Sequence, residues 1–364
     1  MKRCLFSLVL LCLLLPGANA LAGGDSVLNV YNWADYIGET TVADFEAEFG
    51  IEVNYDLYDS TAVVDARLLA GRSGYDVVLT ALRYSARLIE VGVFQPLDRG
   101  SLPLWDNLDP WVLDAMSAYD PGNRHAVPYM WGTTGFAYNV EMVRERMPDA
   151  PLDSAALVFD PANAARFADC GISLLDESTL VIPMVLQYLG HDANSIDVAE
   201  LAEAETALKA IRPYIRYFSS AKVLNDLPNG EICIAMSWSG DYAQARARAE
   251  ESGIEVELAY RVPREGTVLF FDALMIPADA PHPENAHRFL NYLMRPEVIA
   301  PISDLLRYAN GNRASLPLID PKLLGDPAAY PRMAEHPEWQ AGVIYEPKLE
   351  RLRTRAWSRV KTGL

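Results

Sequence analysis

The chain has 364 residues, with 49 acidic against 31 basic side chains and a formal net charge of −18. So acidic a surface argues against nucleic acid as a partner, because phosphates must be neutralised by lysine and arginine. The roughly 344 residues that follow Ala20 exceed what one hydrophobic core usually organises, so two domains are expected.

The first 20 residues have the composition of a secretory signal. Lys2 and Arg3 precede a short apolar run, and Pro16–Ala20 ends the segment with small residues. The run is too short to span a bilayer, which takes ~20 residues, so an uncleaved anchor is the less favoured alternative. Cleavage after about Ala20 removes two positive charges and no negative ones, so the net charge moves from −18 to −20. We therefore expect an exported, soluble protein.

Short β-type runs alternate with helical patterns along the rest of the chain, which is typical of an α/β fold. Strands are predicted at Val27–Trp33, Ile51–Tyr58, Tyr75–Thr80, Gly135–Asn139, Glu231–Trp238, Glu255–Arg261 and Val268–Pro277. Helices are predicted at Glu39–Glu48, Ala62–Leu69, Arg83–Val91, Val140–Met147, Val198–Ile211, Asp241–Ser252 and Pro283–Leu293. The last helix is expected to stop at Pro296.

Two stretches are predicted to cross between lobes. Ala126–Asn139 is an apolar strand interrupted by Gly-Thr-Thr-Gly, which suits a hinge, and a second crossing is expected near Ser252–Val262. A chain that leaves its first lobe, forms a second one and then returns to the first gives two discontinuous lobes with a cleft between them. The predicted boundaries are 21–132 plus 254–306 for the first lobe and 133–253 plus 307–364 for the second.

Three motifs place an aspartate beside aromatic rings at or within a predicted strand. They are Trp33–Tyr36 with Asp35, Trp238–Tyr242 with Asp241, and Phe270–Asp272. Ligands of open α/β sheets bind beyond the carboxyl ends of strands, where the first two motifs lie. A carboxylate gives an alkylammonium a charge-assisted hydrogen bond, and an aromatic face adds ~0.5–2 kcal/mol of cation–π attraction. Together the motifs predict a site for a small cationic ligand.

Each motif also has a purely structural explanation. Asp35 could cap the helix that starts at Glu39, and Asp241 could cap its own helix. Asp272 lies inside an apolar strand, where a carboxylate is costly without a partner, so a structural ion pair with lysine or arginine is the alternative.

Enzyme and metal sites are poorly supported. The five histidines, at positions 125, 191, 282, 287 and 336, are scattered, and neither a metal-ligand spacing nor a nucleophile elbow occurs. The sequence Gly24-Asp25-Ser26, which some hydrolases carry after a strand, here precedes the strand. We therefore expect no catalytic activity, metal or cofactor, and an exported hydrolase is the weaker alternative.

Of the four cysteines, Cys4 and Cys12 lie in the predicted signal. Cys170 and Cys233 remain as an even pair in an oxidising compartment, which favours a disulfide over two buried thiols.

Several stretches resemble the periplasmic putrescine-binding proteins of bacterial polyamine ABC importers. They are "LNVYNWADYIGETTVADFEAEFGIEVNYDLYDS", "PYMWGTTGFAYN", "IRYF", "LPNGEICIAMSWSGDYAQA", "FFDALMIPADA", "FLNYLMRPEV", "YANGNRAS" and "RLRTRAW". The resemblance covers essentially the whole chain after the signal. It implies a two-lobed periplasmic binding protein of the type II fold, which closes on its ligand by a hinge. It also implies an inner-membrane ABC permease as partner, a monomeric state and a Cys170–Cys233 disulfide.

The resemblance also implies a set of ligand-binding residues. One amine is expected at Trp33, Asp35 and Tyr36, and the other at Trp238, Asp241, Phe270 and Asp272, with Tyr308 as an aromatic wall and Thr80 in place of a family serine. Such a site holds two ammonium groups by carboxylates at a fixed separation, which explains selectivity for a diamine.

The chain departs from the family pattern at positions that could alter specificity. Ala34 replaces a serine, Leu180 stands where a glutamate normally faces the ligand, and Glu177 could compensate for it. In the loop Thr80-Ala81-Leu82-Arg83, Arg83 would repel an ammonium if it pointed inward, or it could point to solvent at the start of a helix. Putrescine or a close diamine is the expected ligand, with spermidine, an ω-amino acid or a sensing role as alternatives.

Overall fold

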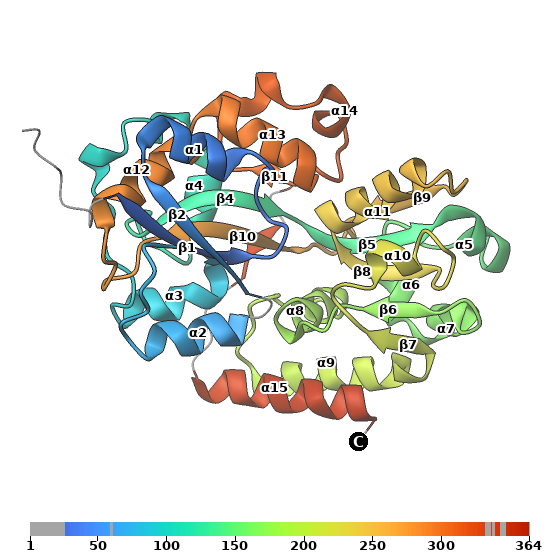
Figure 1. Ribbon diagram of the computed structural model, residues 1–364. Coiled ribbons are helices and arrows are strands. Elements are labelled where there is room, and N and C mark those ends of the chain that lie inside the picture. Colours follow the sequence, from blue (N-terminus) through green and yellow to red (C-terminus); the bar gives the residue numbers. More distant parts are fainter. Residues whose placement is uncertain (1–25, 59–60, 332–335, 337–338, 343–346, 364) are drawn as a thin grey trace, which may run out of the picture.

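The computed structural model describes residues 26–58, 61–331, 336, 339–342 and 347–363. It forms two α/β lobes, each built on its own sheet, as Figure 1 shows. The predicted signal, with Cys4, Cys12 and the cleavage site near Ala20, lies outside the described residues. Within the described part of the chain, no helix is both long and apolar enough to cross a membrane.

The first lobe contains a seven-stranded mixed sheet. Its strands are β1 (Val27–Trp33), β2 (Glu52–Tyr58), β3 (Val77–Ala81), β4 (Ala126–Gly132), β10 (Val268–Met275), β11 (Ala309–Asn310) and β12 (Gln340–Ala341). Their order is β11-β4-β10-β3-β1-β2, with β12 beside β10. Strand β1 is parallel to β2 and β3, whereas β10 is antiparallel to β3 and β4. The central strand β3 is apolar and buried, as expected for a strand covered on both faces.

Helices cover this sheet through apolar contacts. They are α1 (Thr41–Phe49), α2 (Thr61–Leu69), α3 (Leu82–Glu90), α4 (Pro110–Met116), α12 (Pro283–Leu293), α13 (Pro296–Leu306) and α14 (Pro321–Leu324), with the short 3-10 helices η1 (Arg99–Ser101), η2 (Trp105–Asn107) and η5 (Arg313–Leu318). Helix α12 ends at Leu293, near the predicted stop. Pro296 does not begin a loop but opens the next helix, because proline is tolerated in the first helical turn.

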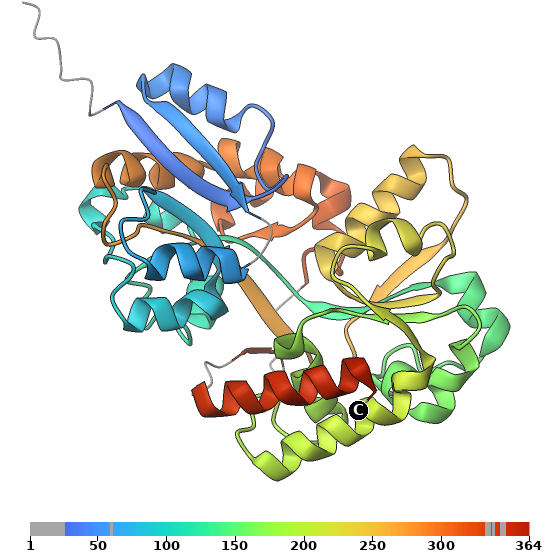
Figure 2. The same ribbon diagram turned by 60° about the horizontal axis from the view of Figure 1, so that its bottom comes forward.

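The second lobe contains a five-stranded sheet in the order β7-β6-β8-β5-β9. Its strands are β5 (Thr134–Asn139), β6 (Ile172–Leu174), β7 (Ile215–Phe218), β8 (Ile234–Trp238) and β9 (Leu258–Arg261). Its helices are α5 (Val140–Arg146), α6 (Ala156–Phe159), α7 (Pro161–Ala164), η3 (Ala165–Phe167), α8 (Ser178–Tyr188), α9 (Val198–Ile211), η4 (Arg212–Tyr214), α10 (Val223–Asp226), α11 (Ser239–Glu251) and α15 (Pro347–Thr362). Figure 2 shows α15 lying along α9, which it contacts.

The crossing between lobes at the Gly-Thr-Thr-Gly stretch is present in the structure. Strand β4 ends at Gly132 in the first sheet, and β5 begins at Thr134 in the second. The returning chain crosses beside it, where Thr267 Oγ1 donates to the Thr134 carbonyl at 2.6 Å and accepts from the Thr134 N–H at 3.1 Å. The two crossings are therefore tied together, as a two-stranded hinge requires.

Three segments, β9, β11 and β12, lie in a different sheet from the one predicted, and β12 was assigned to the second lobe but pairs with β10 in the first. Strand β9 was assigned to the first lobe but pairs with β5 in the second sheet, so the chain returns after residue 261 rather than at 254. Strand β11 was assigned to the second lobe but pairs with β4 in the first. These strands are two to four residues long, and their pairing is set by long-range contacts that local pattern does not encode.

The predicted disulfide is confirmed. Cys170 and Cys233 are bonded, with their Cα atoms 5.5 Å apart, and both side chains are buried in the second lobe. The bond fixes the segment before β6 to the start of β8, the strand that leads to the Trp238–Tyr242 motif.

Candidate ligand-binding site

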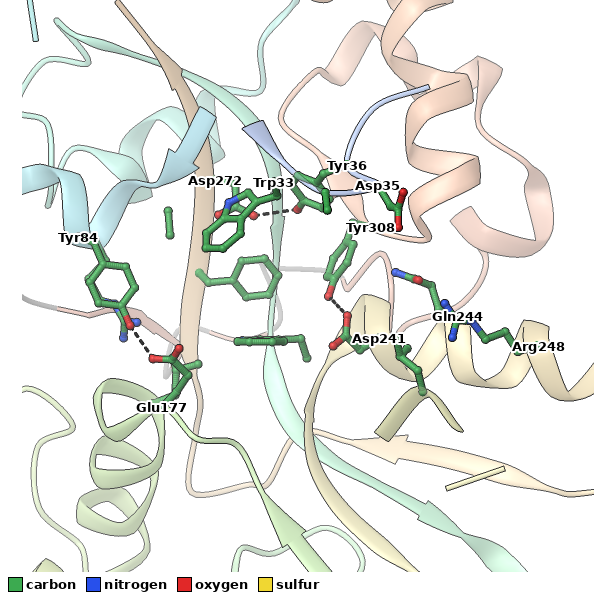
Figure 3. Close-up of a pocket in the computed structure, with 17 residues that line it drawn as sticks. Trp33, Asp35, Tyr36, Tyr84, Glu177, Asp241, Gln244, Arg248, Asp272 and Tyr308 are labelled. Carbon is green, nitrogen blue, oxygen red and sulfur yellow. Dashed lines mark hydrogen bonds between the residues drawn. The ribbon is translucent and has the colours of Figure 1, made fainter. Parts of the chain in front are cut away.

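A cavity of about 380 Å³ lies between the two lobes. Figure 3 shows its lining, which comes from strand ends and helix starts of both lobes. The lining residues are Trp33, Ala34, Asp35, Tyr36, Ala81, Arg83, Tyr84, Glu177, Leu180, Leu224, Trp238, Asp241, Gln244, Arg248, Phe270, Asp272 and Tyr308.

Asp272 supplies the first buried carboxylate. It sits on β10 where the pairing with β4 shifts register, an irregularity of the kind that re-aims a side chain beside functional sites. The Tyr36 hydroxyl donates a hydrogen bond to Asp272 Oδ2 at 2.8 Å. Burial raises the pKa of the Asp272 carboxyl to about 6, although this hydrogen bond and the charge of Arg83 lower it. No cation among the described residues forms an ion pair with Asp272, so no structural ion pair is seen there.

Asp241 supplies the second carboxylate, which is partly buried, from the first turn of α11. The cap residue of this helix is Trp238, so Asp241 does not cap it. The Tyr308 hydroxyl, from the first lobe, donates to Asp241 Oδ1 at 2.6 Å. Burial raises the pKa of the Asp241 carboxyl to about 6, against the lowering effects of this hydrogen bond and of Arg248. Burial also raises the pKa of Tyr308 well above its usual value, so its hydroxyl remains a donor.

Aromatic rings fill the space around the two carboxylates. Phe270 lies edge-on to Tyr308 with ring centroids 5.6 Å apart, and Trp238 lies 6.4 Å from Phe270. Tyr36 lies 6.3 Å from Tyr308, which completes a wall that contacts both aspartates. The Tyr308 ring approaches the α11 backbone so closely that a Cβ at Gly240 would lie 2.4 Å from it, so glycine is required there.

Asp35 lies at the rim of the cavity rather than in its interior. Its side chain is exposed and its backbone φ is 53°, a left-handed conformation that aspartate adopts more readily than most residues. The cap residue of α1 is Thr40, so the capping alternative for Asp35 is wrong. Ala34 lines the same rim.

One end of the cavity joins α3 of the first lobe to the start of α8 in the second. Arg83 points into this end and not to solvent: its Nη1 donates to the Thr179 carbonyl at 2.8 Å. The Tyr84 hydroxyl donates to Glu177 Oε2 at 2.6 Å. Leu180, which stands where the family carries an acid, is buried and lines the same end.

Two predicted positions do not line the cavity. Leu82 is fully buried in the core of the first lobe, because it opens α3 with its side chain packed inward, so Arg83 and Tyr84 form the wall instead. Thr80 is also buried, and its hydroxyl accepts a hydrogen bond from Ser85 at 3.4 Å.

Five lining residues were not predicted from the sequence: Ala81, Tyr84, Leu224, Gln244 and Arg248. Gln244 and Arg248 follow Asp241 by three and seven positions, so helical periodicity could have placed them on the same face of α11. No sequence pattern marks Tyr84 and Leu224, because their position in the cavity lining depends on how the two lobes meet. Across the described ranges, no group of three or more histidine, cysteine or acidic side chains is placed to hold a metal ion.

The comparisons with known proteins agree with this architecture. Residues 40–334 match the family model for bacterial extracellular solute-binding proteins. The chain is 43% identical to the putrescine-binding periplasmic protein PotF of Escherichia coli, over 100% of this chain and 98% of that relative. It is 44% identical to the putrescine-binding periplasmic protein SpuD of Pseudomonas aeruginosa, over the full length of both chains.

The solved structures show the same fold. A putative spermidine/putrescine ABC transporter protein from Listeria monocytogenes superposes with a TM-score of 0.81 at 26% identity, covering 93% of this chain and 100% of that chain. These findings confirm the predicted type II fold and the predicted resemblance. Both relatives are named as putrescine-binding periplasmic proteins, and the matching family model is one of solute-binding proteins. The chain therefore belongs to the bacterial extracellular solute-binding protein family.

Proposed function

We propose that this chain captures putrescine, or a diamine of similar length, in the periplasm and delivers it to an inner-membrane ABC permease. The observation that carries the proposal is the pair of cavity carboxylates, Asp241 and Asp272. We assign one amine to each of them, whereas the sequence resemblance grouped both at one amine and placed the exposed Asp35 at the other. Asp241 and Asp272 each accept a hydrogen bond from a tyrosine, yet neither forms an ion pair with a cation of the described chain. A buried carboxylate without a counter-ion is costly, and a ligand ammonium at each would remove that cost.

The aromatic wall between the carboxylates suits the rest of a diamine. Trp238, Phe270 and Tyr308 present rings to the cavity, which pack against methylene groups and exclude water. The ring faces also attract the ammonium groups. Relatives over the full chain length are named for putrescine binding, which supports the same ligand.

Membership of the same family supports the proposed location and partner. Both relatives are named as periplasmic, and the start of this chain has a signal pattern that ends near Ala20. We expect the mature protein to act as a monomer that closes around one ligand and presents both lobes to the permease.

Isothermal titration at about pH 7.5 with putrescine, butylamine and 4-aminobutyrate tests the proposal. The three ligands share a four-carbon chain, but only putrescine carries two ammonium groups. Putrescine should bind at least ~100-fold more tightly than either of the others, because each of them leaves one buried aspartate unpaired. Absence of heat with every amine, or tighter binding of 4-aminobutyrate, would contradict the proposal.

A further inference from the structure

One end of the cavity carries a positive charge, although the proposed ligand is itself cationic. This end, which we call the Arg83 end, is formed by Arg83 and Tyr84 from α3 and by Glu177 and Thr179 at the start of α8. The Arg83 guanidinium stacks over the Tyr84 ring, 4.6 Å from its centroid, and donates to the Thr179 carbonyl. Two independent contacts therefore hold it in place.

The carboxylate at this end, Glu177, already has a hydrogen-bond partner. Glu177 Oε2 accepts a hydrogen bond from Tyr84, whose ring lies against Arg83. Burial lowers the pKa of Arg83, but the neighbouring phenols and the Glu177 carboxylate outweigh it, and the net shift is upward. Arg83 therefore stays charged, and the Glu177 carboxylate near it already accepts a hydrogen bond from Tyr84.

Each of the two aspartates has an arginine near it. Figure 3 shows Tyr84 and Glu177 at one end of the cavity and Gln244 and Arg248 at the other, with both aspartates between them. Arg83 is near enough to lower the pKa of Asp272, and Arg248 does the same to Asp241. A ligand that extends past either aspartate therefore approaches a guanidinium.

We propose that Arg83 is a specificity-determining residue that limits the ligand to two ammonium groups. It repels a third ammonium at the Arg83 end of the cavity, where the Glu177 carboxylate already accepts a hydrogen bond from Tyr84. The inference rests on the proposed diamine site and defines the ligand length that this site accepts. It predicts preference for putrescine over triamines such as spermidine, which adds an aminopropyl group.

Titration of the full mature chain with putrescine and with spermidine tests this inference. Arg83→Gln removes the charge but keeps a donor for Thr179, and it should raise the ratio of spermidine to putrescine affinity by about tenfold or more. Arg83→Lys keeps the charge and should leave the ratio close to that of the unaltered protein. An unchanged ratio in Arg83→Gln, or equal changes in both variants, would overturn the inference.

Two further variants separate the role of charge from general effects. Arg87 lies one turn along α3 with 55% of its side chain exposed and pairs with Asp65, so Arg87→Gln should not change the ratio. Adding Glu177→Gln to Arg83→Gln should abolish the gain in spermidine affinity, and a gain that persists would refute the part assigned to Glu177. If the unaltered protein does not bind putrescine, the proposed function itself fails. If it binds putrescine but the ratio does not respond, only this inference fails.

Discussion

Tyr308 donates a 2.6 Å hydrogen bond to Asp241, and the two residues belong to different lobes. Tyr308 precedes β11 in the first sheet, whereas Asp241 lies on α11 in the second lobe. A carboxylate of the candidate site is therefore oriented by a residue that reaches it only when the lobes are together. In the proposed function, a ligand ammonium at Asp241 would stabilise this arrangement of the lobes, and we therefore expect ligand binding and closure to be coupled.

Replacing Tyr308 by phenylalanine should weaken diamine binding by about 1–2 kcal/mol, because one oxygen of a buried carboxylate loses its donor. Titration calorimetry measures the change. Tyr75→Phe is the matched control, since it removes a tyrosine–aspartate hydrogen bond to Asp56 at the exposed surface, away from the cavity. Equal losses in the two variants would show that the Tyr308 hydroxyl has no special part in binding.

Asp241→Asn and Asp272→Asn should each weaken putrescine binding by about 3–5 kcal/mol, because an ammonium is then left in a buried site without its carboxylate. Asp35→Asn should cost less than about 1 kcal/mol, because Asp35 is exposed and its charge is screened by solvent. Binding constants from the same titrations give all three values. Unchanged affinity in both buried-site variants would refute the site.

Putrescine binding should weaken as the pH falls through about 6. In the ligand-free protein the pKa values of Asp241 and Asp272 are both raised to about 6, so each carboxyl is about half protonated at that pH. Binding needs the ionised forms and should release roughly one proton in total near pH 6. Titrations in two buffers of different ionisation enthalpy measure this release, and its absence would contradict the raised pKa values.

The same shifts predict how the stability of the ligand-free protein depends on pH. Because these pKa values are higher in the folded than in the unfolded chain, the folded state binds more protons between about pH 4 and pH 6. The contribution of Asp241 and Asp272 to stability therefore falls as the pH rises through this window. Asparagine at either position should reduce that dependence.

Removing the Cys170–Cys233 bond should lower the stability of the second lobe. The two residues are 63 positions apart, and closing a loop of this length is worth ~4 kcal/mol in the chain-entropy model. The double alanine variant should unfold at lower urea concentration, and a reductant should affect the parent protein but not the variant. Neither cysteine lines the cavity, so putrescine affinity should change little.

Much of the fold and the core of the site could be predicted from the sequence. The strand Val27–Trp33 has the predicted bounds, and the aspartates at 241 and 272 lie in the cavity with their aromatic neighbours. These features follow from local apolar runs and from acids placed beside aromatic residues. An aspartate within an apolar run is visible in the sequence itself, and it indicates a functional site because burying a carboxylate is costly.

Other features could not be predicted because they depend on how distant segments meet. Helix α8 was not predicted. It is apolar on nearly every side, so it shows no helical periodicity, and it contains Pro183, a residue that argues against a helix interior. The strand at 309–310 is too short to show a pattern, and its place beside β4 is decided by pairing. The contact of Arg83 with Thr179 joins two lobes, so the sequence could not decide whether Arg83 pointed inward.

A crystal structure with putrescine would show whether each ammonium is held by its own aspartate, through the distances from the two nitrogens to the nearest carboxylate oxygens. One nitrogen should lie within hydrogen-bonding distance of Asp241 and the other within the same distance of Asp272, with the methylene chain against Phe270 and Trp238. A ligand that contacts only one of the two carboxylates, or that lies outside the cavity, would contradict this assignment.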